Sequence, residues 1–308
     1  MAAQGKGFMG KIPVGTTIGY AYGFTFGHLG QIIAQIWLPM LVVTAGGYFG
    51  AAPYYESFSR AAAENNPAAI GQAFTLLLLF AFVSLIFYAM IYVAVTRLAL
   101  GETRPVNFIH FSLGVAEWRM CGAVLGLIFA LFVIAAVVVL AAGLVAGLIG
   151  GLAKGLGVGL AKTTAVGIGG AIMLIVYAAL IYIAVRLSFL VAPVTVAEER
   201  ISLVRGWQLS RGNFWRMAAV LAVTLLPVAL LMVGLEYAIV GGNAVTPKEA
   251  GDLAAVASRM QQMKSHLPMI SGLGFVLSPF MFGLTLGASA FAYRTLVPPP
   301  ENWTGQAG

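Results

Sequence analysis

The run of residues that decides the fold lies at 120–142 and reads MCGAVLGLIFALFVIAAVVVLAA. It carries no charged side chain, and at about 1.5 Å of rise per residue it is long enough to cross the roughly 30 Å of hydrocarbon in a bilayer. Similar runs lie near residues 29–50, 70–96, 168–192, 217–240 and 269–293. The sequence therefore predicts an all-α, polytopic integral membrane protein with about six transmembrane helices.

The composition excludes a soluble enzyme. Of the 308 residues, 60% are hydrophobic and 9% are charged, and the mean hydropathy is +0.95. Soluble domains carry roughly a quarter charged residues. The net charge of +7 comes from basic residues dispersed at the ends of the apolar runs. This placement predicts membrane phospholipid as the partner and argues against nucleic acid.

Orientation follows from the distribution of basic residues. Eleven of the 17 Lys and Arg residues fall on one side of the predicted spans, and loops rich in these residues stay in the cytoplasm. We expect a multi-pass protein of the bacterial inner (cytoplasmic) membrane with both termini cytoplasmic. Residues 298–308, which begin with three prolines, are predicted to form a flexible cytoplasmic tail. On the outer side we expect a polar connection at 51–68 that contains at most one short helical piece, and a short amphipathic surface helix within 244–267.

The chain also repeats itself. Trp118-Arg119-Met120 and Trp215-Arg216-Met217 are the same tripeptide, each at the entrance of a predicted span, and Phe26-Gly27-His28-Leu29 holds the equivalent place before the first span. We predict a single membrane domain, residues 1–308, with three units at approximately 12–103, 104–200 and 201–297. Each unit would be an interfacial helix followed by a hairpin of two spans. Chance matching among apolar residues is the alternative.

The segment from Ile201 to Arg216, ISLVRGWQLSRGNFWR, is the best preserved interfacial piece. With the apolar run that follows, it resembles the membrane domain found beside some bacterial glycerophosphodiester phosphodiesterases and the free-standing inner-membrane proteins related to it, mainly over residues 200–230. The resemblance implies membrane architecture only, because this chain has no counterpart of the soluble catalytic domain. Helical spacing predicts that Leu203, Trp207 and Phe214 face lipid and that the arginines face headgroups.

Arginines at the inner membrane face form a candidate collar for lipid phosphate or another anion. The candidate residues are Arg97, Arg119, Arg186, Arg205, Arg211, Arg216 and Arg294. For each one the alternative is that it anchors a helix end and fixes topology, with its head reaching water.

Glycines recur every four residues over the stretch from 143 to 159. Small residues at this spacing lie along one helix face and let another helix approach closely in lipid. The pattern predicts an extended third helix or a helical outer connection, whose glycine face meets a neighbouring helix or a partner subunit. Its members are Gly143, Gly147, Gly151, Gly155 and Gly159.

Other polar groups give weaker signals. Glu236 is the one acid inside a predicted span, and it falls near the outer boundary, where it can reach water. Met260, Met263 and His266 share a helix face that could hold copper, although methionines at this spacing more often fill a core or face lipid. We predict no metal site, no cofactor and no catalytic residues, and hence no enzyme.

Two functions remain open. The leading hypothesis is a non-enzymatic inner-membrane protein that acts as an assembly or accessory factor, or as a subunit of a larger complex, in contact with anionic lipid and with a protein partner or a second copy. The alternative is a transporter or lipid translocase for an anionic or lipid substrate. Prolines within the spans, at Pro39, Pro227 and Pro279, favour this alternative because they free backbone groups for ligands.

Overall fold

The computed structural model describes residues 10–63, 67–102, 113–155, 162–240 and 253–297. Within these residues every regular element is a helix, so the chain is an all-α protein. The helices are α1 (Val14–Gly27), α2 (Leu29–Ala63), α3 (Pro67–Ala99), α4 (Val115–Gly155), α5 (Lys162–Ser188), α6 (Val191–Ala197), α7 (Leu203–Leu209), α8 (Phe214–Val240) and α9 (Leu253–Leu296).

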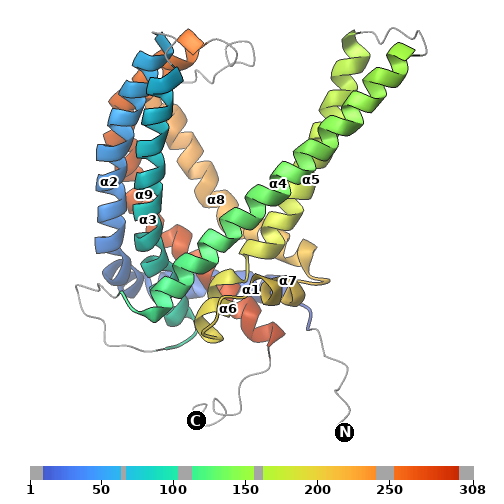
Figure 1. Ribbon diagram of the computed structural model, residues 1–308. Coiled ribbons are helices and arrows are strands. Elements are labelled where there is room, and N and C mark those ends of the chain that lie inside the picture. The colour runs from blue at the N-terminus through green and yellow to red at the C-terminus, as the bar shows by residue number, and fades with distance from the viewer. Residues whose placement is uncertain (1–9, 64–66, 103–112, 156–161, 241–252, 298–308) are drawn as a thin grey trace, which may run out of the picture.

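Six of these helices are long and apolar enough to cross a membrane, which confirms the predicted polytopic architecture. The apolar stretches are Leu29–Ser57, Leu77–Ala99, Val115–Leu152, Gly170–Ala197, Phe214–Leu235 and Lys264–Leu296. Figure 1 shows that the start of α1 and the end of α9 lie at the same end of the molecule, as an even number of crossings requires.

The spanning helices form two groups that diverge from a common base (Figure 1). Helices α2, α3 and α9 pack side by side in one bundle, and α8 packs against α9. Helices α4 and α5 pair as a separate arm that leans away from this bundle. The short helices α1, α6 and α7 gather at the base and connect the two groups. We refer to α4 and α5 together as the arm.

Glycine faces explain why α1 lies tightly across α9. A Cβ on Gly287 would come within 2.7 Å of the Phe24 ring, and one on Gly283 within 2.8 Å of the Thr25 side chain. No larger residue fits at either position without displacing α1. In the same way the Phe80 ring sits on the bare backbone of α2, 2.9 Å from a Cβ placed on Gly46. Small residues therefore set the approach of helices in the bundle.

The most deeply buried side chains lie at the base. Met120 at the start of α4, Met217 at the start of α8 and Leu190 before α6 are all fully buried, and they join one core cluster with Ile12 and Ile91. The outer length of the arm has no such core, since only 6% of the apolar stretch of α4 is buried. This apolar surface must lie in the hydrocarbon of a membrane, because its exposure to water would be strongly unfavourable.

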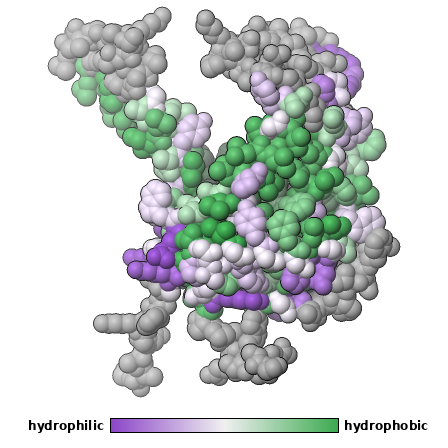
Figure 2. Space-filling view, turned by 180° about the vertical axis from the view of Figure 1, so that it is seen from behind, coloured by the Kyte–Doolittle hydropathy of each residue, from purple (hydrophilic) through white to green (hydrophobic). Residues whose placement is uncertain are grey.

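Figure 2 shows the resulting surface from behind: apolar side chains cover the middle, and hydrophilic ones gather at the base. The exposed aromatic rings Trp118 and Trp215, at the starts of α4 and α8, lie where Trp is typically found at a membrane interface. A gap separates the arm from the bundle, so that this part of the surface is open laterally (Figure 2).

Two expectations for the outer side are wrong. The stretch at 51–68 is no polar connection: α2 continues to Ala63 and α3 begins at Pro67. The predicted short surface helix is part of α9, which runs unbroken from Leu253 through Pro268 and Pro279 to Leu296. Apolar helices can extend well past the minimum span, because in lipid the backbone is best satisfied by continuing the helix. The predicted tail at 298–308 lies outside the described residues.

Candidate functional site: the arginine collar at the base

Arg97, at the end of α3, joins that helix to the start of α4. Its guanidinium lies 3.6 Å from a carboxylate oxygen of Glu102 and 3.7 Å from one of Glu117. The Glu117 side chain is only 4% exposed, and its other oxygen accepts a 2.8 Å hydrogen bond from the Gly114 backbone N–H. Glu117 thereby stabilises the first turn of α4 while it neutralises Arg97.

Arg186, at the end of α5, is buried, and its guanidinium is bound by groups of the protein. Its guanidinium donates to the Ser210 hydroxyl at 3.1 Å, the Tyr182 hydroxyl at 2.9 Å and the Trp207 carbonyl at 2.9 Å. The guanidinium carbon also lies 3.6 Å from the centre of the Trp207 ring, within cation–π range. The expectation that Trp207 faces lipid is therefore wrong: its ring covers the charge of Arg186.

Glu198 forms the centre of a second cluster, between α6, α7 and the end of α9. Its carboxylate pairs with Arg200 at 2.6 Å and with Arg205 at 3.1 Å, and it accepts a hydrogen bond from the Tyr293 hydroxyl at 3.3 Å. Partial burial raises the pKa of Glu198, but hydrogen bonds and charge from Arg200 and Arg205 outweigh burial and hold that pKa below its ordinary value of 4.5. The carboxylate is thus kept ionised.

The segment before α1 is held against the start of α8. The Asn213 side chain, 3% exposed, accepts a 3.1 Å hydrogen bond from the Ile12 N–H and donates a 3.2 Å bond to the Gly10 carbonyl. Arg216 donates to the Ile12 carbonyl at 2.8 Å. These bonds join positions more than 200 residues apart in sequence. They connect the start of the described chain to the start of α8 at the base.

The other collar candidates differ in environment. Arg119 pairs with the exposed Glu199 at 3.2 Å. The Arg294 guanidinium lies beside the turn after α3, 3.4 Å from a Cβ placed on Gly101, whose φ of +81° favours glycine. Arg211 is exposed in the turn after α7. Its guanidinium makes no ion pair within the part of the chain that the structure describes.

The three arginines that end the returning spans share one geometric rule. Arg97 reaches Glu117 at the start of the next hairpin, Arg186 reaches the α7 segment before the third hairpin, and Arg294 reaches Gly101 after the first. The two Trp-Arg-Met tripeptides also match in environment, since Met120 and Met217 are both fully buried. The threefold repeat itself stays a prediction.

The collar is therefore largely a set of contacts between helices. Arg97, Arg119, Arg186, Arg205 and Arg216 each bind a carboxylate, carbonyl, hydroxyl or ring of the protein. Sequence reasoning missed the partners Glu198 and Asn213, although the acids in Ala197-Glu198-Glu199-Arg200 stand out among basic neighbours. Anion binding by the collar stays a prediction, and Arg211 is the candidate with the most accessible guanidinium.

The predicted glycine stripe begins at Gly143, and two glycines of α4 outside it, Gly122 and Gly126, have different surroundings. Near the base, Gly122 and Gly126 of α4 receive Ile201 and Leu203: a Cβ on Gly122 would lie 2.8 Å from Ile201, and one on Gly126 would lie 3.6 Å from Leu203. Leu203 thus faces α4. The prediction that it faces lipid is wrong. Further out, a Cβ added at Gly143, Gly147, Gly151 or Gly155 would meet nothing within 4 Å. Gly159 lies outside the described residues.

The weaker candidates are only partly described. Glu236 lies in α8 and Met260 and Met263 lie in α9, but their side chains fall outside the described residues. His266 is half-buried in α9. Within the described part of the chain, no cluster of three His, Cys, Asp or Glu side chains could hold a metal ion.

Comparisons of the chain with protein-family models, with curated proteins and with solved structures found no match.

Proposed function

We propose that this protein is a non-enzymatic inner-membrane subunit or assembly factor, and that its arm binds another membrane helix. The observation that carries the proposal is the outer glycine face of α4. Gly122 and Gly126 hold side chains of the same chain, whereas a Cβ added at Gly143, Gly147 or Gly151, which also recur every four residues, would meet nothing within 4 Å among the described residues. In lipid, such a face stabilises helix association through close backbone approach.

The burial of the arm supports the same proposal. The apolar stretch of α4 is 6% buried, against 39% for that of α3 in the bundle. Exposed side chains such as Phe129, Phe132 and Leu140 are satisfied by lipid alone, so exposure by itself does not require a partner. The unoccupied glycines are the distinguishing feature, because small residues add nothing to lipid solvation and become favourable when a helix packs on them.

A substitution pair tests this proposal. Gly147→Leu should leave folding intact but release a partner or second copy that the native protein retains in mild detergent. Gly126→Leu is the matched control, since it should disturb packing within the chain and lower thermal stability. Mass spectrometry of the intact assembly gives the readout. A native protein that is strictly solitary, with a mass profile identical to that of Gly147→Leu, would remove the proposal.

The location is part of the same proposal. Basic residues crowd the base, and the cytoplasmic leaflet carries anionic lipid, so we place the base, both termini and Arg211 on the cytoplasmic side. Exposed Trp118 and Trp215 support an interfacial position for this end. The resemblance of residues 200–230 to the membrane domain beside glycerophosphodiester phosphodiesterases agrees with an accessory role in that membrane.

A lipid or anion translocase is the second candidate, and the side opening between the arm and the bundle favours it (Figure 2). A scrambling assay in vesicles with fluorescent anionic phospholipid tests it. Arg211→Gln is the appropriate variant, because Arg216 holds the N-terminal segment and its loss would perturb folding. Movement of lipid no faster than in empty vesicles would exclude this function.

A further inference from the structure

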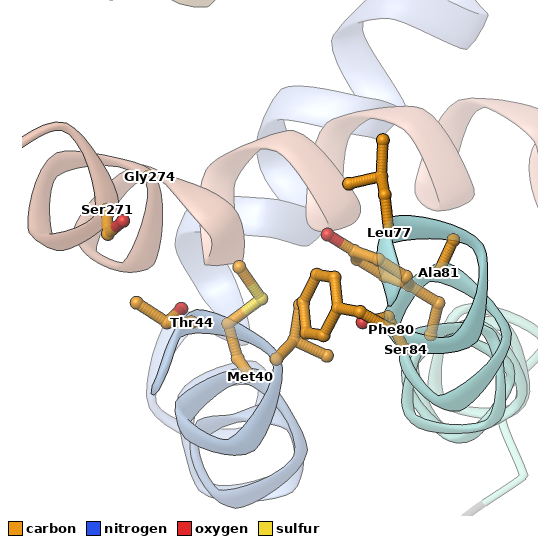
Figure 3. Close-up of a pocket in the computed structure, with 10 residues that line it drawn as sticks. Met40, Thr44, Leu77, Phe80, Ala81, Ser84, Ser271 and Gly274 are labelled. Atoms are coloured by element: carbon orange, nitrogen blue, oxygen red, sulfur yellow. The ribbon is translucent and has the colours of Figure 1, made fainter. Parts of the chain in front are cut away.

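A cavity of about 440 Å³ lies between α2, α3 and α9, within the size range of about 300–1,000 Å³ of small-molecule sites. Figure 3 shows Met40 of α2 together with Leu77 and Phe80 of α3 at its apolar side. The Phe80 ring is fixed in place because it rests on the backbone of Gly46 and Gly50. The apolar wall is thus preformed.

Ser84 supplies an unusual polar group to this cavity. The residue is 6% exposed, and its hydroxyl has no hydrogen-bond partner among the described residues. Two other buried hydroxyls in the spans bond to their own helix: Ser278 donates to the Phe275 carbonyl at 2.8 Å, and Thr224 donates to the Val220 carbonyl at 2.7 Å. Thr96 of α3 also has a buried hydroxyl without a partner among the described residues, but it does not line the cavity. A buried hydroxyl without a partner is destabilising, so Ser84 indicates a ligand atom at this place.

The other residues that line the cavity indicate that the ligand is uncharged. Thr44, Tyr88 and Ser271 add hydroxyls, and none of the side chains around the cavity is charged. A charged ligand would be unfavourable there, because nothing compensates its loss of hydration. The ligand chemistry that fits is a neutral apolar body with one hydrogen-bond acceptor.

The depth of Ser84 in the membrane limits the class of molecule that can reach it. It precedes Arg97 by 13 residues along α3, which is about 20 Å at roughly 1.5 Å per residue. With Arg97 at the inner face of a hydrocarbon layer of about 30 Å, Ser84 lies inside that layer. The ester groups of phospholipids stay near the headgroups. A molecule without a charged headgroup reaches this depth more readily.

We propose that the cavity binds a neutral, lipid-soluble carbonyl compound, whose oxygen accepts a hydrogen bond from the Ser84 hydroxyl while its apolar body packs on Met40, Leu77 and Phe80. The proposal is independent of the function assigned to the arm. It concerns a different group of helices and a different surface.

Photolabelling of the intact protein in lipid nanodiscs tests the proposal. The probe is 4-decylbenzophenone, a neutral ketone whose carbonyl both accepts a hydrogen bond and forms the cross-link, and mass spectrometry of peptides locates the label. We expect labelling on residues of α2, α3 and α9 that line the cavity. Ser84→Ala should reduce it about fivefold, as a hydrogen bond inside a membrane allows, and Gly274→Leu, which extends into the cavity, should abolish it.

Two controls make the outcome decisive. Ser278→Ala removes a buried hydroxyl outside the cavity and should leave labelling unchanged, and a phosphatidylcholine with a benzophenone at its chain end should label Ser84→Ala and native protein equally. Thermal unfolding without probe should show Ser84→Ala at least as stable as native protein and Ser278→Ala as less stable. Labelling indifferent to Ser84→Ala and Gly274→Leu, a Ser84-dependent phosphatidylcholine label, or destabilisation by Ser84→Ala would each overturn the proposal.

Discussion

The guanidinium carbon of Arg186 lies 3.6 Å from the centre of the Trp207 ring, and the same guanidinium donates a 2.9 Å hydrogen bond to the Trp207 carbonyl. One arginine thus binds both the side chain and the backbone of one residue. Because Arg186 ends α5 and Trp207 lies in α7, this contact attaches the arm to the segment that precedes α8.

Arg186→Lys should destabilise the protein by about 2 kcal/mol, because lysine keeps the charge but loses the planar fork and the stacked ring contact. The measurement is the thermal unfolding midpoint in detergent. Arg200→Lys is the control, since the Arg200 side chain is 60% exposed and its replacement should change the midpoint little. Equal effects of the two substitutions would contradict this account.

Asn213→Ala should free the segment before α1, since it removes both hydrogen bonds to that segment and leaves the buried Ile12 N–H and the part-buried Gly10 carbonyl without these bonds. We expect faster cleavage near residues 10–13 in limited proteolysis, with the spans intact. Asn213→Asp retains the acceptor for the Ile12 N–H and should give an intermediate rate. A cleavage pattern identical to that of the native protein in both variants would show that the segment is held by other contacts.

Glu198→Gln should alter the dependence of stability on pH. The folded-state pKa of Glu198 lies below 4.5, so its ionised form stabilises the fold above about pH 4.5, and this contribution is lost as pH falls through the lower folded pKa. The native unfolding midpoint should therefore fall more steeply than that of Glu198→Gln on acidification below about pH 4.5. Above it, native protein should be the more stable of the two. Parallel curves would contradict the assigned role.

Gly287→Leu should separate α1 from α9 and cost about 3 kcal/mol, the upper range for overpacking, because even a Cβ would lie 2.7 Å from the Phe24 ring. Gly272→Leu is the matched control in the same helix, where a Cβ would meet nothing within 4 Å. Unfolding midpoints in one detergent give the comparison. Helix propensity favours Leu over Gly in both variants, so a loss of stability in Gly272→Leu as large as in Gly287→Leu would contradict the role assigned to the close approach of α1.

Run length predicted the membrane fold, because the physics of a spanning helix is local: about 20 apolar residues suffice. The break between α1 and α2 at His28 and the positions of the tripeptides are also visible in the sequence. The partners of the arginines are not. Asn213 meets Ile12 across 201 positions, and no local pattern marks either residue for the other.

Trp207 illustrates the same limit. Its spacing with Leu203 placed it on an apolar stripe, and an apolar stripe next to a bilayer is expected to face lipid. Both side chains instead contact other parts of the protein, Trp207 at Arg186 and Leu203 at Gly126. Periodicity identifies a face, but the nearest apolar surface in the folded chain decides what covers it.

The length of α4 has a consequence for the bilayer itself. The charge-free part of its apolar stretch, residues 120–152, has 33 residues and measures about 50 Å, well above the roughly 30 Å of hydrocarbon. A tilt of about 40°, the upper end for membrane helices, still leaves it too long. The surrounding lipid must thicken or the helix must incline further, so this hydrophobic mismatch couples membrane thickness to the spread between arm and bundle. In a thinner membrane the arm would tilt further from the membrane normal, and in a thicker membrane it would tilt less.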